Sequence, residues 1–405
     1  MRNEGWLYLI GGLALIGLLL REGQLFIVAV ILLLTAALSR VWEHYCLVGL
    51  SYRRELGQSR AFFGEEVPLT IEIVNDKPLP LAWLEVDDGV PGASQTEITP
   101  GGVSPSHIPG RRMLGMLLSI RWYERIRRHY RVRCIARGYH AFGPSTLRTG
   151  DVFGFATREL EVPHEDYLLV YPRIVALDRL GLPAADPFGD VPLRQQWLFE
   201  DPLRTVGVRE YRPGDSPRRL HWKATARAPG QQLQVKLFEP TTTHRVLVLL
   251  NISTTDTNWS WAGYDPEVLE AAITTAASVA SWASERGLLV GLGANGKLFR
   301  SGTAVRIPPS RDPHQLMHIL EALARLVPMP TMAPETLLEL EQHGLAYGTS
   351  IVLITATISD LMVRQLRRLQ SAGHRPSVLL ISSDEHPLAR LDGLPGYAIR
   401  VEDTQ

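Results

Sequence analysis

Basic residues gather in the stretch VREYRPGDSPRRLHWKATAR, which covers residues 208–227. Six of its side chains are Arg or Lys, whereas only Glu210 and Asp215 are acidic. Arginine presents a planar fork of N–H donors that matches a carboxylate or a phosphate, so this composition suits an anion. The whole chain has 42 Lys and Arg residues against 42 Asp and Glu residues, so no global charge attracts nucleic acid. Any basic function must therefore be local.

Three interpretations of this basic stretch are open. It could be a hinge between two modules, in which Glu210 and Asp215 each pair with an arginine and Trp222 packs as a wedge. It could be a docking patch for an acidic partner or a phosphate. It could also be an enzymatic site, which would need His221 beside Asp215 or Glu210, because arginine cannot shuttle protons near neutral pH. We predict no catalytic residue. The predicted signature and interaction residues are Arg209, Glu210, Tyr211, Arg212, Pro213, Gly214, Asp215, Arg218, Arg219, Trp222, Lys223 and Arg227.

A second candidate site follows the apolar run RVLVLL, where the chain places Asn251, Ser253 and Thr255. This pattern resembles the von Willebrand factor A domain, whose first strand ends in Asp-x-Ser-x-Ser and helps to bind Mg²⁺ or a similar hard cation. Here Asn251 replaces the first aspartate, and Thr355-Ala356-Thr357 stands where the family typically has Thr-Asp-Gly. Since such cations depend on anionic oxygens, we predict a degenerate site, no metal and no cofactor. The alternative is that Asp256 or Asp360 supplies the missing carboxylate.

The segment GLGANG, residues 291–296, fits the GxGxxG pattern of dinucleotide-binding proteins. That pattern requires a helix at the last glycine, whose backbone amides meet the pyrophosphate. The strand-like sequence KLFRSGTAVRI follows instead, and no acidic residue closes a βαβ unit beyond it. We therefore predict a hairpin turn at these glycines and no dinucleotide site.

The last part of the chain, residues 242–405, alternates apolar runs with helical patterns. Buried strands are predicted at residues 245–250, 288–293, 350–355 and 377–382. Helices are predicted over residues 265–286, 312–327, 334–342 and 361–372, the first opened by Asp265-Pro266-Glu267. Such alternation predicts a doubly wound α/β sheet, here a von Willebrand factor A-like domain.

Residues 48–172 have a different pattern, with apolar residues at every second position and turn residues between the runs. VPLTIEIVN and HYRVRCIAR are examples, and they predict an antiparallel β-sandwich-like module. Residues 173–241 then form a connector that carries the basic stretch. In it we expect a short helix over RRLHWKATAR, followed by a strand LQVKLFEP that joins the α/β sheet beside RVLVLL.

Two charge-free apolar runs, residues 6–20 and 25–38, lie near the start of the chain. With their flanking residues they approach the roughly 20 residues that cross a bilayer. We predict a transmembrane hairpin within residues 1–45, with helices at about 6–21 and 24–41. A secretory signal is the competing interpretation, but no small-residue cleavage site follows the first run. Arg2 and Arg40 flank the pair, so the positive-inside rule places both ends in the cytoplasm. Reduced cysteines, Cys46 and Cys134, agree with that compartment.

This succession of segments resembles the bacterial family called domain of unknown function fifty-eight. The resemblance covers nearly the whole chain and rests on VREY, PGD, RR, WK and AR in the basic stretch, and on Gly138-Tyr139, Gly143-Pro144 and DVFG at residues 151–154. Val152 is a departure, because the family often has proline there. Members are commonly encoded beside a MoxR-type AAA+ ATPase, sometimes with a membrane transglutaminase-like protein. The family has no established activity.

We therefore expect a multidomain cell-membrane protein whose soluble domains are cytoplasmic and which works by interaction. The resemblance implies that it is a partner or adaptor of a MoxR-type AAA+ ATPase, in the assembly or maturation of other proteins. The expected contacts are a protein and the lipid bilayer, and not nucleic acid, because the basic stretch is short and holds few aromatics. The alternative is a membrane-bound enzyme acting on an anionic substrate at the basic stretch.

Overall fold

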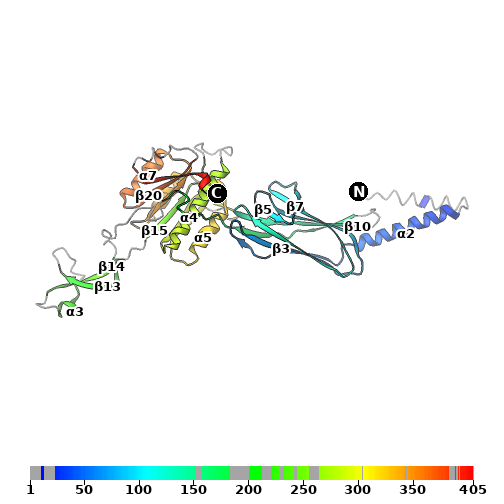
Figure 1. Cartoon of the computed structure of the whole chain (residues 1–405), viewed down its shortest axis with the longest axis horizontal. Coiled ribbons are helices and arrows are strands. Elements are labelled where there is room, and N and C mark those ends of the chain that lie inside the picture. The colour runs from blue at the N-terminus through cyan, green and yellow to red at the C-terminus, as the bar shows by residue number, and fades with distance from the viewer. Residues whose placement is uncertain are drawn as a thin grey trace. The chain divides into compact units, whose positions relative to one another are not determined.

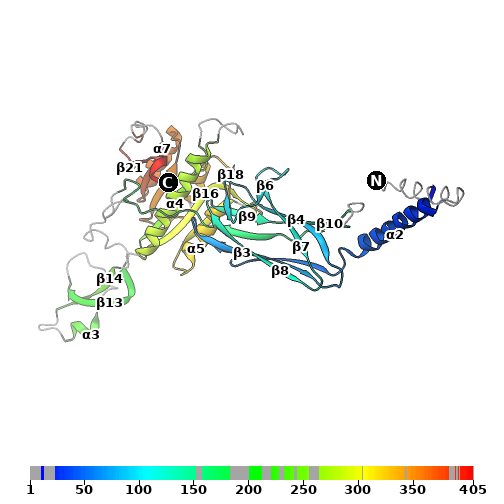
Figure 2. The same cartoon turned by 45° about the vertical axis from the view of Figure 1, so that its right-hand side comes forward.

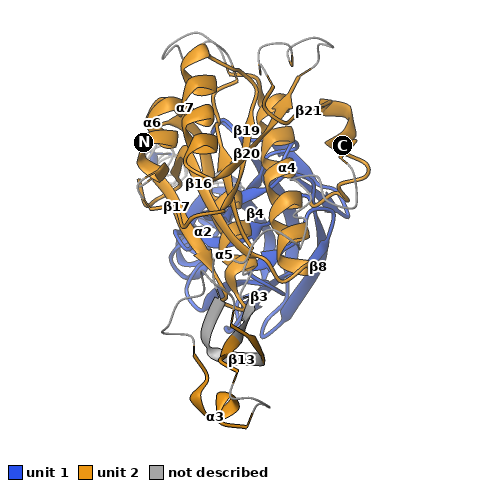
Figure 3. Ribbon diagram, turned by 90° about the vertical axis from the view of Figure 1, so that its left-hand side faces the viewer, with its two compact units in different colours: residues 1–173 blue, residues 174–405 orange. Residues whose placement is uncertain are grey.

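A computed structural model describes residues 11–12, 23–151, 157–182, 200–211, 220–227, 232–240, 244–254, 264–302, 304–342, 344–382, 388, 391 and 393–404. The chain divides into two compact units, residues 1–173 and residues 174–405 (Figure 3). The finer division into four parts stays a prediction. Each unit is described by itself below.

The first unit begins with the helix α2, Gly23–Tyr45. Its residues Ile27–Tyr45 are long and apolar enough to cross a membrane. Most of its large apolar side chains are exposed, among them Ile31, Leu34 and Leu38. The predicted helix at about residues 6–21 lies almost entirely outside the described residues, so one of the two expected spans is described.

Two β-sheets follow α2 and share one apolar core (Figures 1 and 2). The first sheet has the antiparallel order β1 (Leu50–Leu56), β3 (Glu66–Asn75), β8 (Arg125–Cys134) and β5 (Thr96–Thr99). The second has the order β11 (Thr157–Val162), β10 (Ser145–Gly150), β4 (Leu81–Pro91), β7 (Arg111–Ile120) and β6 (Val103–Pro105). A small third sheet joins β2 (Arg60–Ala61), β12 (Asp166–Val170) and β9 (Gly138–Phe142).

Alternation along these strands separates core from solvent, as the sequence predicts. In β3, Leu69, Ile71 and Ile73 are fully buried, and Cys134 of β8 is a buried free thiol. The opposite face of β8 carries exposed arginines that pair with glutamates on neighbouring strands. Arg125 and Arg127, for example, both reach Glu72 at 3.1 Å. Surface pairs of this kind add little stability but keep the face soluble.

The second unit holds a mostly parallel sheet in the order β17-β16-β15-β19-β20-β21. Its parallel strands are β15 (Arg245–Leu250), β16 (Leu289–Leu298), β19 (Ser350–Thr355), β20 (Arg375–Ile381) and β21 (Gly396–Ile399). β17 (Ala304–Ser310) and β18 (Leu326–Pro330) pair with β16 in the antiparallel sense. A short 3₁₀ helix, Val401–Thr404, ends the described chain.

Helices cover both faces of this sheet. Figure 3 shows α4 (Pro266–Glu285) on one side, with α6 (Pro334–Gln342) and α7 (Asp360–Ser371) on the other. Asp265 accepts hydrogen bonds from the Glu267 and Val268 amides, so the predicted cap of α4 is confirmed. The helix α5 (Gln315–Ala324) is shorter than predicted, because the chain enters strand β18 at Leu326.

The predicted hairpin turn at GLGANG is wrong, because residues 291–296 lie inside the continuous strand β16. The glycines are needed for close packing. A Cβ on Gly291 would lie 2.7 Å from the Ile307 carbonyl oxygen of β17, and one on Gly296 would lie 2.8 Å from the Leu326 side chain. The strand continues where the dinucleotide pattern requires a helix, so no such site forms at these glycines.

The expected placement of LQVKLFEP is also wrong. Its strand β14 (Gln234–Pro240) pairs with β13 (Glu200–Glu210) in a separate two-stranded antiparallel sheet, and not with β15. The expected helix over RRLHWKATAR is reduced to the single turn α3 (Trp222–Thr225). Leu220 instead forms a β-bridge with Val235, which excludes it from a helix. Backbone pairing with β14 therefore competes with helix formation here.

Candidate functional site

The described parts of the basic stretch lie on β13 and α3. We call the two-stranded sheet of β13 and β14, together with α3, the ribbon. Of its predicted interaction residues, the structure describes Arg209, Glu210, Tyr211, Trp222, Lys223 and Arg227. The others lie outside the described residues: Arg212, Pro213, Gly214, Asp215, Arg218 and Arg219.

The two ends of the segment 212–219 are held at one place on β14. Before it, the Tyr211 amide donates to the Leu233 carbonyl at 2.8 Å. After it, Leu220 bridges Val235, and the His221 amide donates to the Gln234 carbonyl at 2.8 Å. The residues on either side of the arginine-rich segment, Tyr211 and Leu220, are therefore both held by backbone contacts to residues 233–235.

The single turn α3 is fastened from both sides. Nδ1 of His221 accepts from the Ala224 amide at 3.0 Å, which makes His221 the N-cap. The Thr225 hydroxyl accepts from the Gln234 amide at 2.9 Å and so ties α3 to β14. Because Nδ1 of His221 serves the cap, only Nε2 is left for chemistry. No hydrogen bond joins His221 to Glu210 within the described residues, and Asp215, the other acid that an enzymatic site could use, lies outside them.

The ribbon presents an aromatic ring and cations to solvent. Trp222 is 70% exposed, and Val208 and Leu233 are exposed as well. Lys223 and Arg227 are also exposed, and no carboxylate in the described part of the chain is within ion-pair distance of either. A shallow depression of about 620 Å³ is lined by Val208, His221, Lys223, Ala224, Arg227 and Gln234. The depression is open, and cations and an apolar side chain line it together.

The second candidate site lies at the carboxyl end of the parallel sheet, where Asn251 follows β15. Its Oδ1 accepts from the Ser253 amide at 3.1 Å and from Nδ2 of Asn295 at 2.8 Å. Its Nδ2 donates to the Thr355 hydroxyl at 2.9 Å. Asn251, Asn295 and Thr355 are all buried, and Oδ1 of Asn295 accepts from the Ile252 amide at 2.8 Å. These amides link the ends of three neighbouring strands, β15, β16 and β19.

This amide network contains no carboxylate. Thr255 and Asp256 lie outside the described residues, and Asp360 is an exposed residue at the start of α7. In the described part of the chain, no three His, Cys, Asp or Glu residues come together as a cation would need. Asn295 was missed from the sequence because it stands within GLGANG, which we interpreted as a turn. A polar residue near the end of a buried parallel strand was the available signal.

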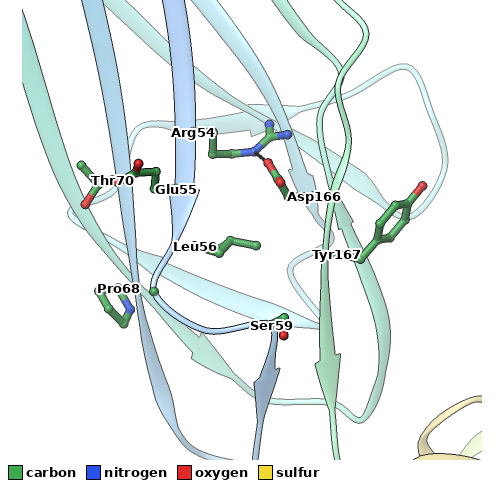
Figure 4. Close-up of a pocket in the computed structure, with 9 residues that line it drawn as sticks. Arg54, Glu55, Leu56, Ser59, Pro68, Thr70, Asp166 and Tyr167 are labelled. Atoms are coloured by element: carbon green, nitrogen blue, oxygen red, sulfur yellow. Dashed lines mark hydrogen bonds and ion pairs between the residues drawn. The ribbon is translucent and has the colours of Figure 1, made fainter.

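A third polar cluster, in the first unit, was also missed from the sequence. The Arg54 side chain on β1 is 2% exposed, and it donates to Asp88 and Asp166 at 2.5 and 2.9 Å. It also donates to the carbonyls of Phe142 and His164 at 2.8 and 3.0 Å. Figure 4 shows Arg54 and Asp166 at the edge of a pocket of about 490 Å³. Since these partners occupy its guanidinium, Arg54 holds strands together and is not available to a ligand.

Comparison with known proteins gives one family and distant relatives. Residues 207–389 match the family described as protein of unknown function DUF58, which confirms the resemblance drawn from the sequence. The uncharacterized protein YeaD of Bacillus subtilis is 22% identical over 358 residues, covering 86% of this chain and 80% of that protein.

Solved structures resemble only parts of the chain. A cohesin module of a Clostridium perfringens family 33 glycoside hydrolase has a TM-score of 0.22 and 14% identity, covering 30% of this chain and 96% of that one. The CARDB domain of a Pyrococcus furiosus protein has a TM-score of 0.20 and 7% identity, covering 30% and 91%. Scores this low carry no information about function.

Proposed function

We propose that this DUF58-matching chain is a membrane-anchored interaction protein, and that the ribbon is its docking element for an acidic protein partner. The observation that carries the proposal is the exposure of Trp222 beside Lys223 and Arg227. Trp222 in α3 lies near the exposed Val208 and Leu233 of the same ribbon, and a group of exposed apolar side chains beside cations is typical of an interaction site. Tryptophan and arginine are also the residues that most often dominate binding energy at protein interfaces.

The partner that we propose is a MoxR-type AAA+ ATPase, with this chain acting as its adaptor in the assembly or maturation of other proteins. The family resemblance supports this choice, and the exposed cations Lys223 and Arg227 of the ribbon would match an acidic surface on the ATPase. Oppositely charged surfaces chiefly accelerate encounter and fix orientation, whereas a buried aromatic anchor slows dissociation.

The α/β unit is, in this proposal, a von Willebrand factor A-like domain that no longer binds a metal. Its support is the parallel sheet with helices on both faces and the uncharged amide network at its carboxyl edge. The proposed location is the cell membrane, with two spanning helices and the soluble domains in the cytoplasm. The apolar helix α2 supports the anchoring, and the distribution of arginines around it supports the orientation.

Co-purification with the proposed MoxR-type ATPase tests whether the ribbon is the docking element. We expect Trp222→Ala, and separately the double change Lys223→Glu and Arg227→Glu, to abolish recovery of the ATPase from solubilised membranes. The matched control is Tyr264→Ala, because Tyr264 is another exposed aromatic residue of the same unit. Recovery equal to that of the unchanged chain in both ribbon variants would refute the ribbon as the docking element.

A further inference from the structure

The first unit carries a pair of exposed aromatic residues, far in sequence from the ribbon. The turn between β7 and β8 exposes Trp122 by 64% and Tyr123 by 65%. Tyr123 has a positive φ of 51°, a conformation that costs free energy for a residue other than glycine. Arg121 precedes the pair and is exposed, and the described residues provide no carboxylate as its ion-pair partner.

Hydrogen bonds fix this turn beside the end of the apolar helix α2. The Tyr123 amide donates to the Lys77 carbonyl at 3.2 Å, and Nδ2 of Asn75 donates to the Arg121 carbonyl at 2.8 Å. Nζ of the buried Lys77 then donates to the carbonyl of Cys46, the residue directly after α2, at 2.6 Å. The turn thus lies one side chain away from the end of the helix.

More exposed apolar side chains surround that helix end. Tyr45 is the last residue of α2, and Val48 follows three residues later; both are exposed. We call Tyr45, Val48, Arg121, Trp122 and Tyr123 the tip surface. It combines aromatic rings with an arginine, which is the composition found where proteins meet the boundary between lipid and water.

The depth of the tip surface agrees with such a boundary. The predicted membrane span ends at about residue 41. An α-helix rises about 1.5 Å per residue, so Cys46 lies roughly 7 to 8 Å farther along the axis. The headgroup layer on each side of a bilayer is about 5 to 7 Å thick. Residues level with Cys46 therefore lie at the outer edge of the headgroup layer, from which long side chains reach into it.

We propose that the tip surface binds the headgroup region of an anionic phospholipid bilayer and so holds the β-sheets against the membrane. Trp122 and Tyr123 insert among the headgroups, and Arg121 contacts lipid phosphates. This inference rests on the proposed membrane anchoring through α2 and is independent of docking at the ribbon. An acidic protein is the competing occupant, but continuity with the apolar helix favours lipid.

Spin labels on the full chain in vesicles test the inference. Cys46 and Cys134 are buried free thiols, so a nitroxide reagent attaches selectively to an introduced cysteine. Trp122→Cys reports the tip surface, and Leu33→Cys reports the exposed apolar face of α2. Phe63→Cys is the matched control, because Phe63 is an exposed aromatic residue next to Gly64, whose amide bonds Cys134 at the far end of β8.

We expect the label at position 122 to collide more with dissolved oxygen and less with a water-soluble nickel chelate than the label at position 63. The difference in oxygen and nickel access between the two labels should be greater in vesicles that contain phosphatidylglycerol than in vesicles of pure phosphatidylcholine. Arg121→Gln should reduce the equilibrium constant for contact between the tip surface and the bilayer about fivefold, since one arginine near an anionic surface is worth about 1 kcal/mol.

Several outcomes would overturn the inference. Equal nickel access at positions 122 and 63, with position 33 inside lipid, would refute the tip surface and leave the anchoring intact. Nickel access at position 33 would refute the anchoring and the inference together. Protection of position 122 that persists in detergent without a bilayer would assign the surface to protein.

A second measurement avoids the introduced cysteine. Brominated lipids should quench less of the total emission in Trp122→Phe than in the unchanged chain. Trp222→Phe, which removes the exposed tryptophan of the ribbon, should leave the quenched fraction unreduced. Equal quenching in Trp122→Phe and the unchanged chain would also overturn the inference.

Discussion

At the scale of single residues, Arg54 shows how a charged side chain can become part of a core. Its donors are taken up by Asp88, Asp166, Ser145 and two backbone carbonyls. Asp88 is fully buried, and it also accepts from the Tyr52 hydroxyl at 2.8 Å. Burial raises the pKa of Tyr52, so this hydroxyl keeps its proton and remains a donor. The cluster links β1, β4 and the strand β12.

Arg54→Met should therefore increase the fraction of molecules in which the core of the first unit is exposed to solvent. The change leaves Asp88 buried without its cation, which costs about 3 to 5 kcal/mol. A loss of 3 kcal/mol in the free energy of unfolding raises the population of molecules with an exposed core more than a hundredfold. The measurement is the rate at which a maleimide reacts with Cys46 and Cys134, both of which lie in this core. Arg53→Met is the control, because the exposed Arg53–Glu55 pair contributes about 0 to 1 kcal/mol. Equal labelling rates in the two variants would contradict the prediction.

At the scale of elements, strand β16 depends on glycine at positions that also misled the sequence interpretation. Gly291 faces the backbone of β17, whereas Gly293 faces the flexible end of the Leu249 side chain. The backbone of β17 cannot move aside as the Leu249 side chain can. An added methyl group should therefore be tolerated less well at Gly291 than at Gly293. Both glycines allow neighbouring elements to approach β16 closely.

Gly291→Ala should destabilise the second unit by about 1 to 3 kcal/mol, the usual cost of overpacking a tight contact. A Cβ at this position would lie 2.7 Å from both the Ile307 oxygen and the Pro309 ring. Gly344→Ala is the control, since its Cβ meets only the end of the Arg306 side chain at 3.3 Å, and no backbone atom. Thermal unfolding in detergent measures both. If Gly291→Ala melts at the same temperature as Gly344→Ala, the close approach does not constrain β16.

Elements with strong local signals could be predicted from the sequence. The cap at Asp265, the apolar run of β19 and the alternation of β3 each determine their own structure. Pairing partners could not be predicted in the same way. The strand β14 carries no local feature that selects β13 over β15, because strand pairing depends on segments far apart in the sequence. The same limit hid the bridge between Leu220 and Val235.

The candidate sites were predictable in part for the same reason. Residue types such as Trp222 and Lys223 pointed to the ribbon, and Asn251 pointed to the carboxyl edge of the sheet. The sequence could not show that Asn295 completes the network, or that Arg54 meets Asp88 from another sheet. Such contacts exist only after distant strands have paired.

At the scale of the whole molecule, α2 and the β-sheets form one packed structure. The Ser39 hydroxyl donates to Asp151 at 2.8 Å in a buried position, and Glu43 pairs with Arg158 at 3.7 Å. Cys46 is fully buried in the core of the sheets, and Trp42 packs against that core. The end of the helix is therefore a structural part of the first unit as well as a possible anchor.

A soluble fragment should show this dependence. We expect a fragment that starts at Leu38 to unfold at a clearly higher temperature than one that starts at Val48. The shorter fragment loses the buried Cys46 and the partly buried Leu47 and Trp42, and burial of apolar surface contributes about 25 cal/mol per Å² to stability. Thermal unfolding followed by circular dichroism compares the two. Equal melting temperatures would mean that the helix end contributes nothing to the fold.

The bond from Lys77 to the end of α2 also has a mechanical consequence. Ser39, Glu43 and Cys46 all contact residues of the sheets, and these contacts oppose rotation of α2 relative to the sheets. A rotation of α2 about its own axis would therefore rotate the β-sheets with it.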